Sequence, residues 1–312
     1  MLNLYIDSLH LKLYDFSIDT PFGYQQGQHM TESAIIEPGQ FPKNVFSRIL
    51  LAIHEQHIVK APFVHALRCA CAARGELEIV DVRPAGQRGE TIGVREYLER
   101  WGYLKPQSKR SDVAAIGLRI KKVMKDGNRR RLIKKRLERH PHDLMVVGTV
   151  RHNHHGGILG SSLAAYLANY FRHTTFFFPE GARPFIDEAT GSVALRRIVM
   201  PVENAEFYRH AAEYIKGLAA LFPDTSMEVI TLHAGTSFPA IETIEIPLVT
   251  WRQELRGELV VPAICALADQ VRADLVVMAT NGRNTISQKL IGSNTEQVLR
   301  TVSCPVLSVS VL

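Results

Sequence analysis

The sequence predicts an α/β fold of the doubly wound kind, repeated twice in tandem, with each copy a five-stranded parallel sheet covered by helices on both faces. Three observations predict this fold. The apolar runs are continuous rather than alternating, as in central strands that are buried on both faces. Helical stretches separate these runs. The same order of elements occurs twice within 312 residues, a length that suits two domains.

The first copy is expected at residues 47–180. Continuous apolar runs mark its strands, and helical periodicity marks its helices. The predicted strands are Ile49–Ile53, Glu76–Val82, Leu118–Val123, Leu144–Gly148 and Thr174–Phe178. The predicted helices are Phe63–Arg74, Val94–Tyr103, Arg129–Arg139 and Ser162–Tyr170.

The second copy is expected at residues 196–312, after a linker at 181–195. It repeats the alternation of strand and helix that favours a parallel sheet with crossover connections. The predicted strands are Ile198–Val202, Met227–His233, Ile246–Arg252, Leu275–Ala279 and Val306–Val311. The predicted helices are Ala205–Leu221, Leu259–Val271 and one that begins at Ser293.

Residues 1–46 match neither copy. Polar turns such as Asp19-Thr20-Pro21 and Glu37-Pro38-Gly39-Gln40 interrupt short apolar pieces in this segment. We expect a poorly ordered N-terminal extension.

Two further stretches indicate an internal duplication. His142–Thr149 resembles Ala273–Thr280, and Ile158–Ser161 resembles Leu290–Ser293. Both pairs lie around the loop that follows the fourth strand of each copy. In a doubly wound sheet, ligands bind beyond the carboxyl ends of the strands, where the strand order reverses. These loops are therefore the predicted ligand sites.

The composition is that of an ordinary globular chain, with 46% hydrophobic and 22% charged residues. No apolar run approaches the ~18 residues that span a bilayer, and the N-terminus lacks the basic start and apolar stretch of a signal peptide. The four cysteines are too few for a disulfide framework and are expected to be small buried residues in a reducing compartment. The expected location is the cytoplasm, and no membrane partner is expected.

The formal net charge is +6, and much of the basic excess lies between Arg119 and Arg139. Such a run is either a patch for nucleic acid and other acidic surfaces or a solvated helix face. Aromatic residues do not interleave with these charges, which argues against RNA. We therefore prefer the solvated face and do not expect nucleic acid as a partner.

The loop after the fourth strand of the second copy has features of a phosphate-binding loop. Ala279 and Gly282 are small residues at the end of a strand, where the backbone turns and a ligand can approach closely. Gly292 comes just before a helix, whose first N–H groups lack internal partners and lie at the positive end of the helix dipole. Hydroxyl and cationic groups that can join a phosphate there belong to Ser293, Thr295, Arg283 and Lys289.

A structural explanation competes with this one. Ser293 and Glu296 have the spacing of a capping box, which satisfies the first amides of a helix without any ligand. Considered alone, a Gly-Ser pair at a helix start favours the cap. The longer pattern around it shifts the balance toward a phosphate site.

That longer pattern resembles the universal stress protein family. ATP-binding members carry Gly, two residues, Gly, nine residues, Gly, and then Ser or Thr. This chain has Ala279, Gly282, Gly292 and Ser293 at that spacing. The flanking residues are similar too, in Ala273-Asp274-Leu275-Val276-Val277-Met278 and in Ser303-Cys304-Pro305-Val306-Leu307-Ser308-Val309. The resemblance covers residues 47–312 as two repeats.

The resemblance implies a flavodoxin-like fold of the adenine nucleotide alpha hydrolase type for each copy, and an ATP site with Mg²⁺ or Mn²⁺ in the second. Pro201-Val202-Glu203 occupies the place where nucleotide-binding members have an aspartate that holds the adenosine end. The backbone around Ala234 corresponds to the position that contacts adenine. The implied site residues are Pro201, Val202, Glu203, Ala234, Met278, Ala279, Asn281, Gly282, Arg283, Gly292, Ser293, Asn294 and Thr295.

Two departures from the family pattern bear on this site. Glu203 is one methylene longer than the aspartate it replaces. Ala279 replaces the first loop glycine, at a cost near ~1 kcal/mol if the turn requires a positive φ.

The first copy departs further from the pattern. His54 stands at the carboxylate position, Arg151 stands at the second glycine, and the loop is shorter by one residue. Arginine at positive φ is unfavourable, so this loop has to be rebuilt. The candidate second site comprises His54, Val82, Gly148, Arg151, Gly160 and Ser161.

Three histidines in this loop, His152, His154 and His155, raise the question of a metal site. The neighbouring Arg151 disfavours a cation, and neither a carboxylate nor a cysteine is close in sequence. We do not expect a metal site here.

The leading functional hypothesis is an ATP-binding stress-response regulator that changes shape or partners when occupied. The alternative is a scaffold of the same fold that works through protein partners with an empty pocket. A slow ATPase is a third reading, but the sequence marks no general base to position water, so enzymatic turnover is not expected.

The last strand of each copy is expected at a sheet edge, where an uncovered apolar strand invites pairing. The resemblance implies association through this strand. We expect Val306–Val311 to pair with Thr174–Phe178 within one chain as an internal pseudo-dimer, which leaves a homodimer open.

Overall fold

The computed structural model describes residues 45–53, 60–83, 93–149, 173–242, 244–257, 259–281 and 293–311. All of these residues belong to one compact unit, Glu37–Leu312. Nearly all of the predicted extension at 1–46 lies outside the described residues. The exception is its end, where Phe46 is buried and packs edge-on against Tyr214. The packed chain thus begins before residue 47.

The elements of the first half follow the predicted order. They are β1 (Arg48–Ile53), α1 (Lys60–Ala73), β2 (Glu76–Arg83), α2 (Val94–Arg100), α3 (Arg110–Ala115), β3 (Arg119–Asp126), α4 (Arg129–Arg139), β4 (Leu144–Thr149) and β5 (Thr175–Pro179). The short helix α3 was not predicted, because its six residues carry only one buried apolar side chain, that of Val113. The predicted helix Ser162–Tyr170 lies outside the described residues.

The second half repeats this order. Its elements are β6 (Arg197–Pro201), α6 (Ala205–Leu221), β7 (Met227–Ala234), β8 (Val249–Arg256), α7 (Val260–Gln270), β9 (Leu275–Asn281), α8 (Ser293–Thr301) and β10 (Val306–Val311). Strand β8 begins three residues later than predicted, since Ile246 is buried in the turn that precedes it.

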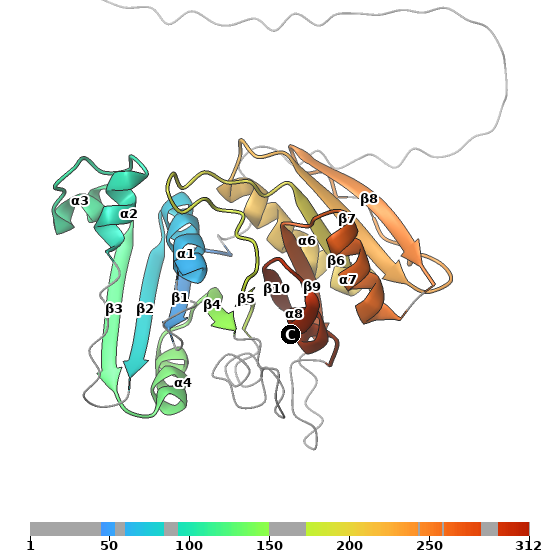
Figure 1. Cartoon of the computed structure of the whole chain (residues 1–312), viewed down its shortest axis with the longest axis horizontal. Coiled ribbons are helices and arrows are strands. Elements are labelled where there is room, and N and C mark those ends of the chain that lie inside the picture. Colours follow the sequence, from blue (N-terminus) through green and yellow to red (C-terminus); the bar gives the residue numbers. More distant parts are fainter. Residues whose placement is uncertain are drawn as a thin grey trace, which may run out of the picture. The chain divides into compact units, whose positions relative to one another are not determined.

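Across the described residues the strands form one ten-stranded sheet, in the order β3-β2-β1-β4-β5-β10-β9-β6-β7-β8 (Figure 1). Neighbouring strands are parallel except β5 and β10, which are antiparallel. The prediction of an α/β fold with parallel strands is confirmed. The five-stranded sheets expected for the two copies are joined into one continuous sheet, because the last strands of the two halves pair with each other, as expected for Val306–Val311 and Thr174–Phe178.

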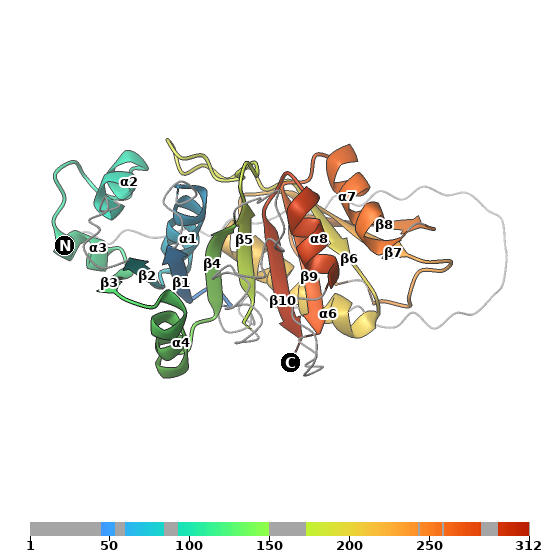
Figure 2. The same ribbon diagram turned by 60° about the horizontal axis from the view of Figure 1, so that its bottom comes forward.

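This central pairing follows from the composition of the two strands. Phe177 lies opposite Val306, and Phe176 lies opposite Leu307, with all four side chains buried. Figure 2 shows β5 and β10 side by side in the middle of the sheet. Each strand would expose unpaired backbone groups and apolar side chains if it stood alone at an edge.

Apolar side chains fill both faces of the sheet. One cluster joins α1 and α6 to the sheet through residues such as Phe63, Leu67 and Ile215. The other joins α4, α7 and α8 through Ile133, Ile264 and Val298. This layering explains why the strands are continuous apolar runs. No helix in the described part of the chain is long and apolar enough to cross a membrane.

The segment 181–195, predicted to be a linker, packs into the fold. Phe185, Ile186 and Leu195 are buried, and Ile186 forms an isolated antiparallel bridge with Val193. The buried imidazole of His65 on α1 accepts the backbone N–H groups of Phe185 and Ile186, each at 3.2 Å. The connection between the halves is therefore held by hydrogen bonds to α1.

Candidate functional site

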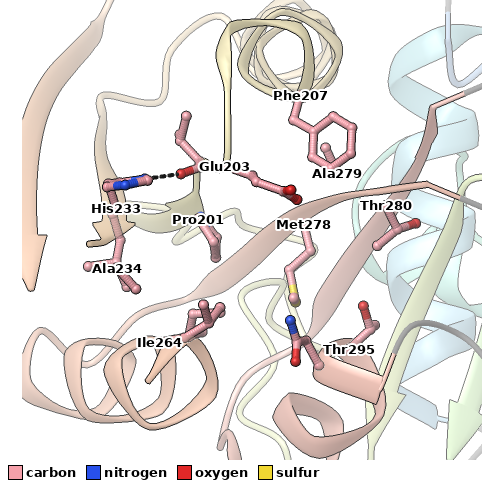
Figure 3. A pocket seen from close by; sticks show the side chains of 14 residues that line it. Pro201, Glu203, Phe207, His233, Ala234, Ile264, Met278, Ala279, Thr280 and Thr295 are labelled. Atoms are coloured by element: carbon pink, nitrogen blue, oxygen red, sulfur yellow. Dashed lines mark hydrogen bonds between the residues drawn. The ribbon is translucent and has the colours of Figure 1, made fainter. Parts of the chain in front are cut away.

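A cavity of about 470 Å³ lies at the carboxyl ends of the strands of the second half. Strand β6 has β7 on one side and β9 on the other, so the chain leaves β6 in one direction and later returns on its opposite side. Such a reversal leaves a crevice between the crossover connections. The cavity is lined by Pro201, Val202, Glu203, Phe207, Leu232, His233, Ala234, Val260, Ile264, Met278, Ala279, Thr280, Asn294 and Thr295 (Figure 3).

Many of the residues selected from the sequence meet here, although they come from four separate stretches of the chain. These are Pro201, Val202, Glu203, Ala234, Met278, Ala279, Asn294 and Thr295. The other residues predicted for the nucleotide site are not described well enough to be placed relative to the cavity. Gly282, Arg283 and Gly292 lie outside the described residues, as do the side chains of Asn281 and Ser293.

The junction between β6 and α6 positions Glu203. The backbone N–H of Val202 donates to the carbonyl of Leu232 at 2.8 Å, which extends the contact between β6 and β7 by one residue. The side chain of Asn204 then accepts the N–H of Phe207 at 3.0 Å and caps α6. The chain therefore turns at Glu203, whose exposed side chain points into the cavity on the side of Phe207 and Met278 (Figure 3).

His233, near the end of β7, is held beside the backbone that precedes Glu203. Its Nδ1 atom lies 2.8 Å from the carbonyl oxygen of Val202. A carbonyl only accepts hydrogen bonds, so Nδ1 is the donor in this contact. The ring also packs edge-on against Phe238. A Cβ atom at position 235 would lie 2.5 Å from Nε2, so the glycine there leaves room for this orientation.

Ala279 lies within strand β9 and not in a left-handed turn. Among the described residues, the non-glycine residues with positive φ are Arg74, Gln107, Leu248 and Arg272. The expected penalty for alanine at this position therefore does not arise. The next residue, Thr280, donates its hydroxyl to the carbonyl of Val309 at 3.3 Å and so links the cavity wall to β10.

Helix α8 closes the cavity with its first turn. Thr295 is buried, and Asn294 beside it is exposed. Glu296 would complete a capping box with Ser293, but its Oε1 atom contacts Arg300 one turn later at 2.5 Å. This oxygen is directed along the helix and not toward the helix start.

The described lining is mostly apolar and carries little charge. Val260 and Ile264 on α7 and Phe207 on α6 form apolar walls, while Glu203 and His233 are the ionisable members. Lysine and arginine are absent from the part of the lining that the structure describes. The described residues nowhere gather three or more side chains suited to bind a metal ion. This part of the cavity therefore suits an uncharged, partly apolar chemical group with hydrogen-bond donors.

Several lining residues escaped the sequence prediction, namely Phe207, Leu232, His233, Val260, Ile264 and Thr280. Two of them directly adjoin predicted residues, since His233 precedes Ala234 and Thr280 follows Ala279, and Leu232 lies two positions before Ala234. Phe207 belongs to the first turn after Glu203, where a helix that starts at a strand end borders the crevice. Val260 and Ile264 gave no local signal, because their spacing of four marks any buried helix face.

The candidate second site falls largely outside the described residues. His54, Arg151, Gly160 and Ser161 are not described, and neither are His152, His154 and His155. Gly148 is buried within β4, and Val82 is described only through its backbone in β2. The second site therefore stays a prediction.

Comparisons with known proteins identify relatives of this chain. Residues 240–310 match the model of the universal stress protein family. A universal stress protein of Methanocaldococcus jannaschii is 34% identical over 143 residues, which covers 38% of this chain and 84% of the relative.

Two solved structures share the fold at low sequence identity. A universal stress protein from Archaeoglobus fulgidus DSM 4304 aligns with a TM-score of 0.56 and 16% identity, over 85% of this chain and 96% of its own. A functionally unknown protein from Pseudomonas aeruginosa PAO1 aligns with a TM-score of 0.54 and 14% identity, over 86% of this chain and 94% of its own.

The fold and the cavity define a doubly wound α/β protein with a ligand-sized crevice where its strand order reverses. The extent of the match to the Methanocaldococcus protein, 34% identity along 84% of that relative, establishes the kinship. The chain belongs to the universal stress protein family. The region matched by the family model contains β9 and α8, which supply one side of the cavity.

Proposed function

We propose that this chain is a stress-response regulator that binds ATP, with Mg²⁺ or Mn²⁺, in the cavity of its second half. One observation carries the proposal. Residues picked from the sequence as a nucleotide site, on three strand ends and one helix start, line a single cavity of about 470 Å³. That volume lies within the range of small-molecule sites.

The adenosine end of the nucleotide is assigned to the described part of the cavity. The carboxylate of Glu203 is an acceptor for ribose hydroxyls or for the adenine amine. The apolar side chains of Phe207, Val260 and Ile264 offer the surface against which a base can pack. The absence of lysine and arginine from this described lining fits an uncharged group.

The phosphates are assigned to the start of α8. Asn294 and Thr295 lie in its first turn, where helix amides and the helix dipole favour an anion. The positive charge would come from Arg283 and Lys289, which are outside the described residues. A divalent ion bound to the phosphates would neutralise part of their charge.

Isothermal titration calorimetry with ATP, AMP and adenosine tests this assignment. We expect Glu203→Gln to weaken all three ligands, because each carries the adenosine end. Gly292→Asp should weaken ATP most and adenosine least, because a carboxylate at the helix start repels phosphates. Glu213→Gln is the matched control, since Glu213 is exposed on α6 and does not line the cavity. Absence of heat with millimolar ATP would refute the proposal.

The scaffold alternative predicts a different outcome in cells. It gains support from the lack of cations in the described lining, because a pocket without a phosphate partner would bind ATP weakly. Ala279→Leu places a larger side chain in the cavity wall. Loss of stress survival with this variant supports nucleotide-dependent regulation, whereas full survival supports a scaffold that acts through protein partners.

A further inference from the structure

A second and larger cavity of about 970 Å³ lies in the first half, between α2, α3 and the edge strand β3. Figure 1 shows α2 and α3 beside the start of β3, at the opposite end of the sheet from β6–β9. The floor of this groove is apolar, because Val94, Val113 and Leu118 are buried beneath it. Four cations stand around the floor, namely Arg95, Arg110, Arg119 and Lys122.

Carboxylates balance part of this charge, but the described lining itself holds four cations and one carboxylate. Glu96 is the acidic residue in the described lining, and its Oε1 atom already pairs with Arg100 at 2.8 Å. Arg119 lies 3.5 Å from Glu76 in an exposed ion pair, a kind that contributes little energy. Arg95 donates from Nη1 to the backbone carbonyl of Ser108 and also lies near the carboxylate of Glu99, whose pKa is lowered mainly by hydrogen bonds from Ser108 and further by Arg95. The groove therefore carries a net positive charge.

Two of these cations, Arg95 and Lys122, repel each other electrostatically. The pKa of Lys122 is lowered, mainly because its ammonium group is desolvated and also because the Arg95 guanidinium lies near it. In the described part of the chain, β3 is the edge strand of the sheet and has no further strand beside it. A bound anion between the two side chains would offset their repulsion.

We propose that this groove binds an organic phosphate that has an aliphatic body. Arginine presents a planar fork of donors that matches phosphate oxygens, and three of the four cations are arginines. The buried apolar floor provides a surface for hydrocarbon. Aromatic side chains are absent from the described lining, so nothing there stacks on a nucleobase. The volume is at the upper end of small-molecule sites.

Calorimetry with n-hexyl phosphate, inorganic phosphate and 1-hexanol tests the proposal on the full-length chain. We expect hexyl phosphate to bind at one site and at least ~10-fold more tightly than inorganic phosphate, since only the ester also buries hydrocarbon. Hexanol alone should bind too weakly to detect. Amide chemical shifts in labelled protein should change at Val113 and Ile120, which line the groove.

Two matched double variants distinguish binding in the groove from a general effect of surface charge on phosphate binding. Arg95→Gln with Lys122→Gln should weaken hexyl phosphate at least ~10-fold. Arg131→Gln with Lys135→Gln removes the same charge from exposed positions on α4 and should change nothing. Equal weakening in both variants, displacement of hexyl phosphate by ATP, or no binding to the parent protein would each overturn the proposal. Circular dichroism verifies that both variants fold.

Discussion

The Nδ1 atom of His233 lies 2.8 Å from the carbonyl oxygen of Val202, so the end of β7 is bound to the residue that follows β6. Both residues line the cavity of the second half. The hydrogen bond holds the backbone next to Glu203, whose carboxylate is the proposed partner of the adenosine end.

We expect His233→Ala to weaken ATP binding about 5- to 10-fold, because Val202 and Glu203 lose their fixed position. Unfolding free energy should fall by about 1 kcal/mol, the typical contribution of one hydrogen bond. Titration calorimetry and urea denaturation measure the two effects. His210→Ala, at an exposed position on α6, serves as the control and should leave both values unchanged. Equal ATP affinity in the two variants would argue against this role of His233.

Two substitutions at Ala279 should act in different ways. Ala279→Leu places a larger side chain in the cavity and should abolish ATP binding in calorimetry. Ala279→Gly should keep binding and lower the unfolding free energy by about 0.5–1 kcal/mol, because glycine weakens a strand interior. A gain in stability with glycine would mean that residue 279 adopts a positive φ and that β9 ends earlier than described.

The stability of the protein should fall in acid partly through His65. Burial lowers the pKa of His65 from 6.5 to about 3, and the ring accepts two backbone N–H groups. Because the folded pKa is below the unfolded one, the neutral ring contributes its full stability above pH 6.5 and loses it as the pH falls toward 3. Between pH 7 and pH 5, the contribution of His65 to the unfolding free energy should fall by on the order of 2 kcal/mol.

Urea denaturation at pH 7 and pH 5 tests this expectation. His65→Leu should unfold more easily at pH 7, because Phe185 and Ile186 lose their acceptor. Its stability should change less between the two pH values than that of the parent protein. The pKa values of His142 and His173 are also lowered by burial, and both residues remain in the variant, so the difference isolates His65. An unchanged pH dependence would contradict the assignment.

Glycines 191 and 181 provide a matched test of how segment 181–195 packs. Both have positive φ values, 70° and 73°. A Cβ atom at Gly191 would lie 2.7 Å from the Trp101 ring, whereas one at Gly181 meets nothing within 4 Å. Gly181→Ala should cost about 1 kcal/mol for the backbone alone. Gly191→Ala should cost about 1–3 kcal/mol more, because the indole is displaced. Thermal unfolding measures both, and equal losses would mean that this segment is not packed on α2.

Because the carboxylate of Glu78 is buried, the unfolding free energy should depend more strongly on Arg136 than on the other cations of α4. Arg136 and His142 both contact Glu78, whose side chain is 1% exposed. Arg136→Ala leaves this carboxylate without its cation and should cost about 3 kcal/mol or more. Lys135→Ala, on the exposed side of the same helix, should stay within about 0.5 kcal/mol. Denaturant unfolding measures both variants. Similar losses of unfolding free energy would show that the buried ion pair contributes no more than an exposed charge.

The pattern of apolar residues was sufficient to predict most elements. Helix periodicity placed α4 and α6 at their observed bounds, and an apolar run placed β10. Local patterns carry this information because burial on one face or on both faces imposes a period on the residues of each element. The doubly wound order placed the site at the carboxyl ends of the strands. The family resemblance selected residues such as Glu203, Ala279 and Thr295, and these do line one cavity there.

Other features depend on partners far away in sequence. The orientation of His233 requires the carbonyl of Val202, and the burial of Phe185 and Ile186 requires the imidazole of His65, 120 and 121 positions away. A composition rich in polar and small residues made segment 181–195 resemble a linker, although long-range hydrogen bonds hold it in place.

The sequence by itself determined the class of fold and the order of strands and helices, because both depend on local periodicity and on chain direction. The resemblance to the universal stress protein family selected the individual residues that meet at the switch point. The expected pairing of the last strands is observed between β5 and β10, and only the tertiary structure decided its antiparallel register and the continuation of β9 past Ala279 to Asn281. The physical reason is that the register between residues 129 to 133 positions apart depends on how the apolar edges of both folded halves meet, which no local pattern records.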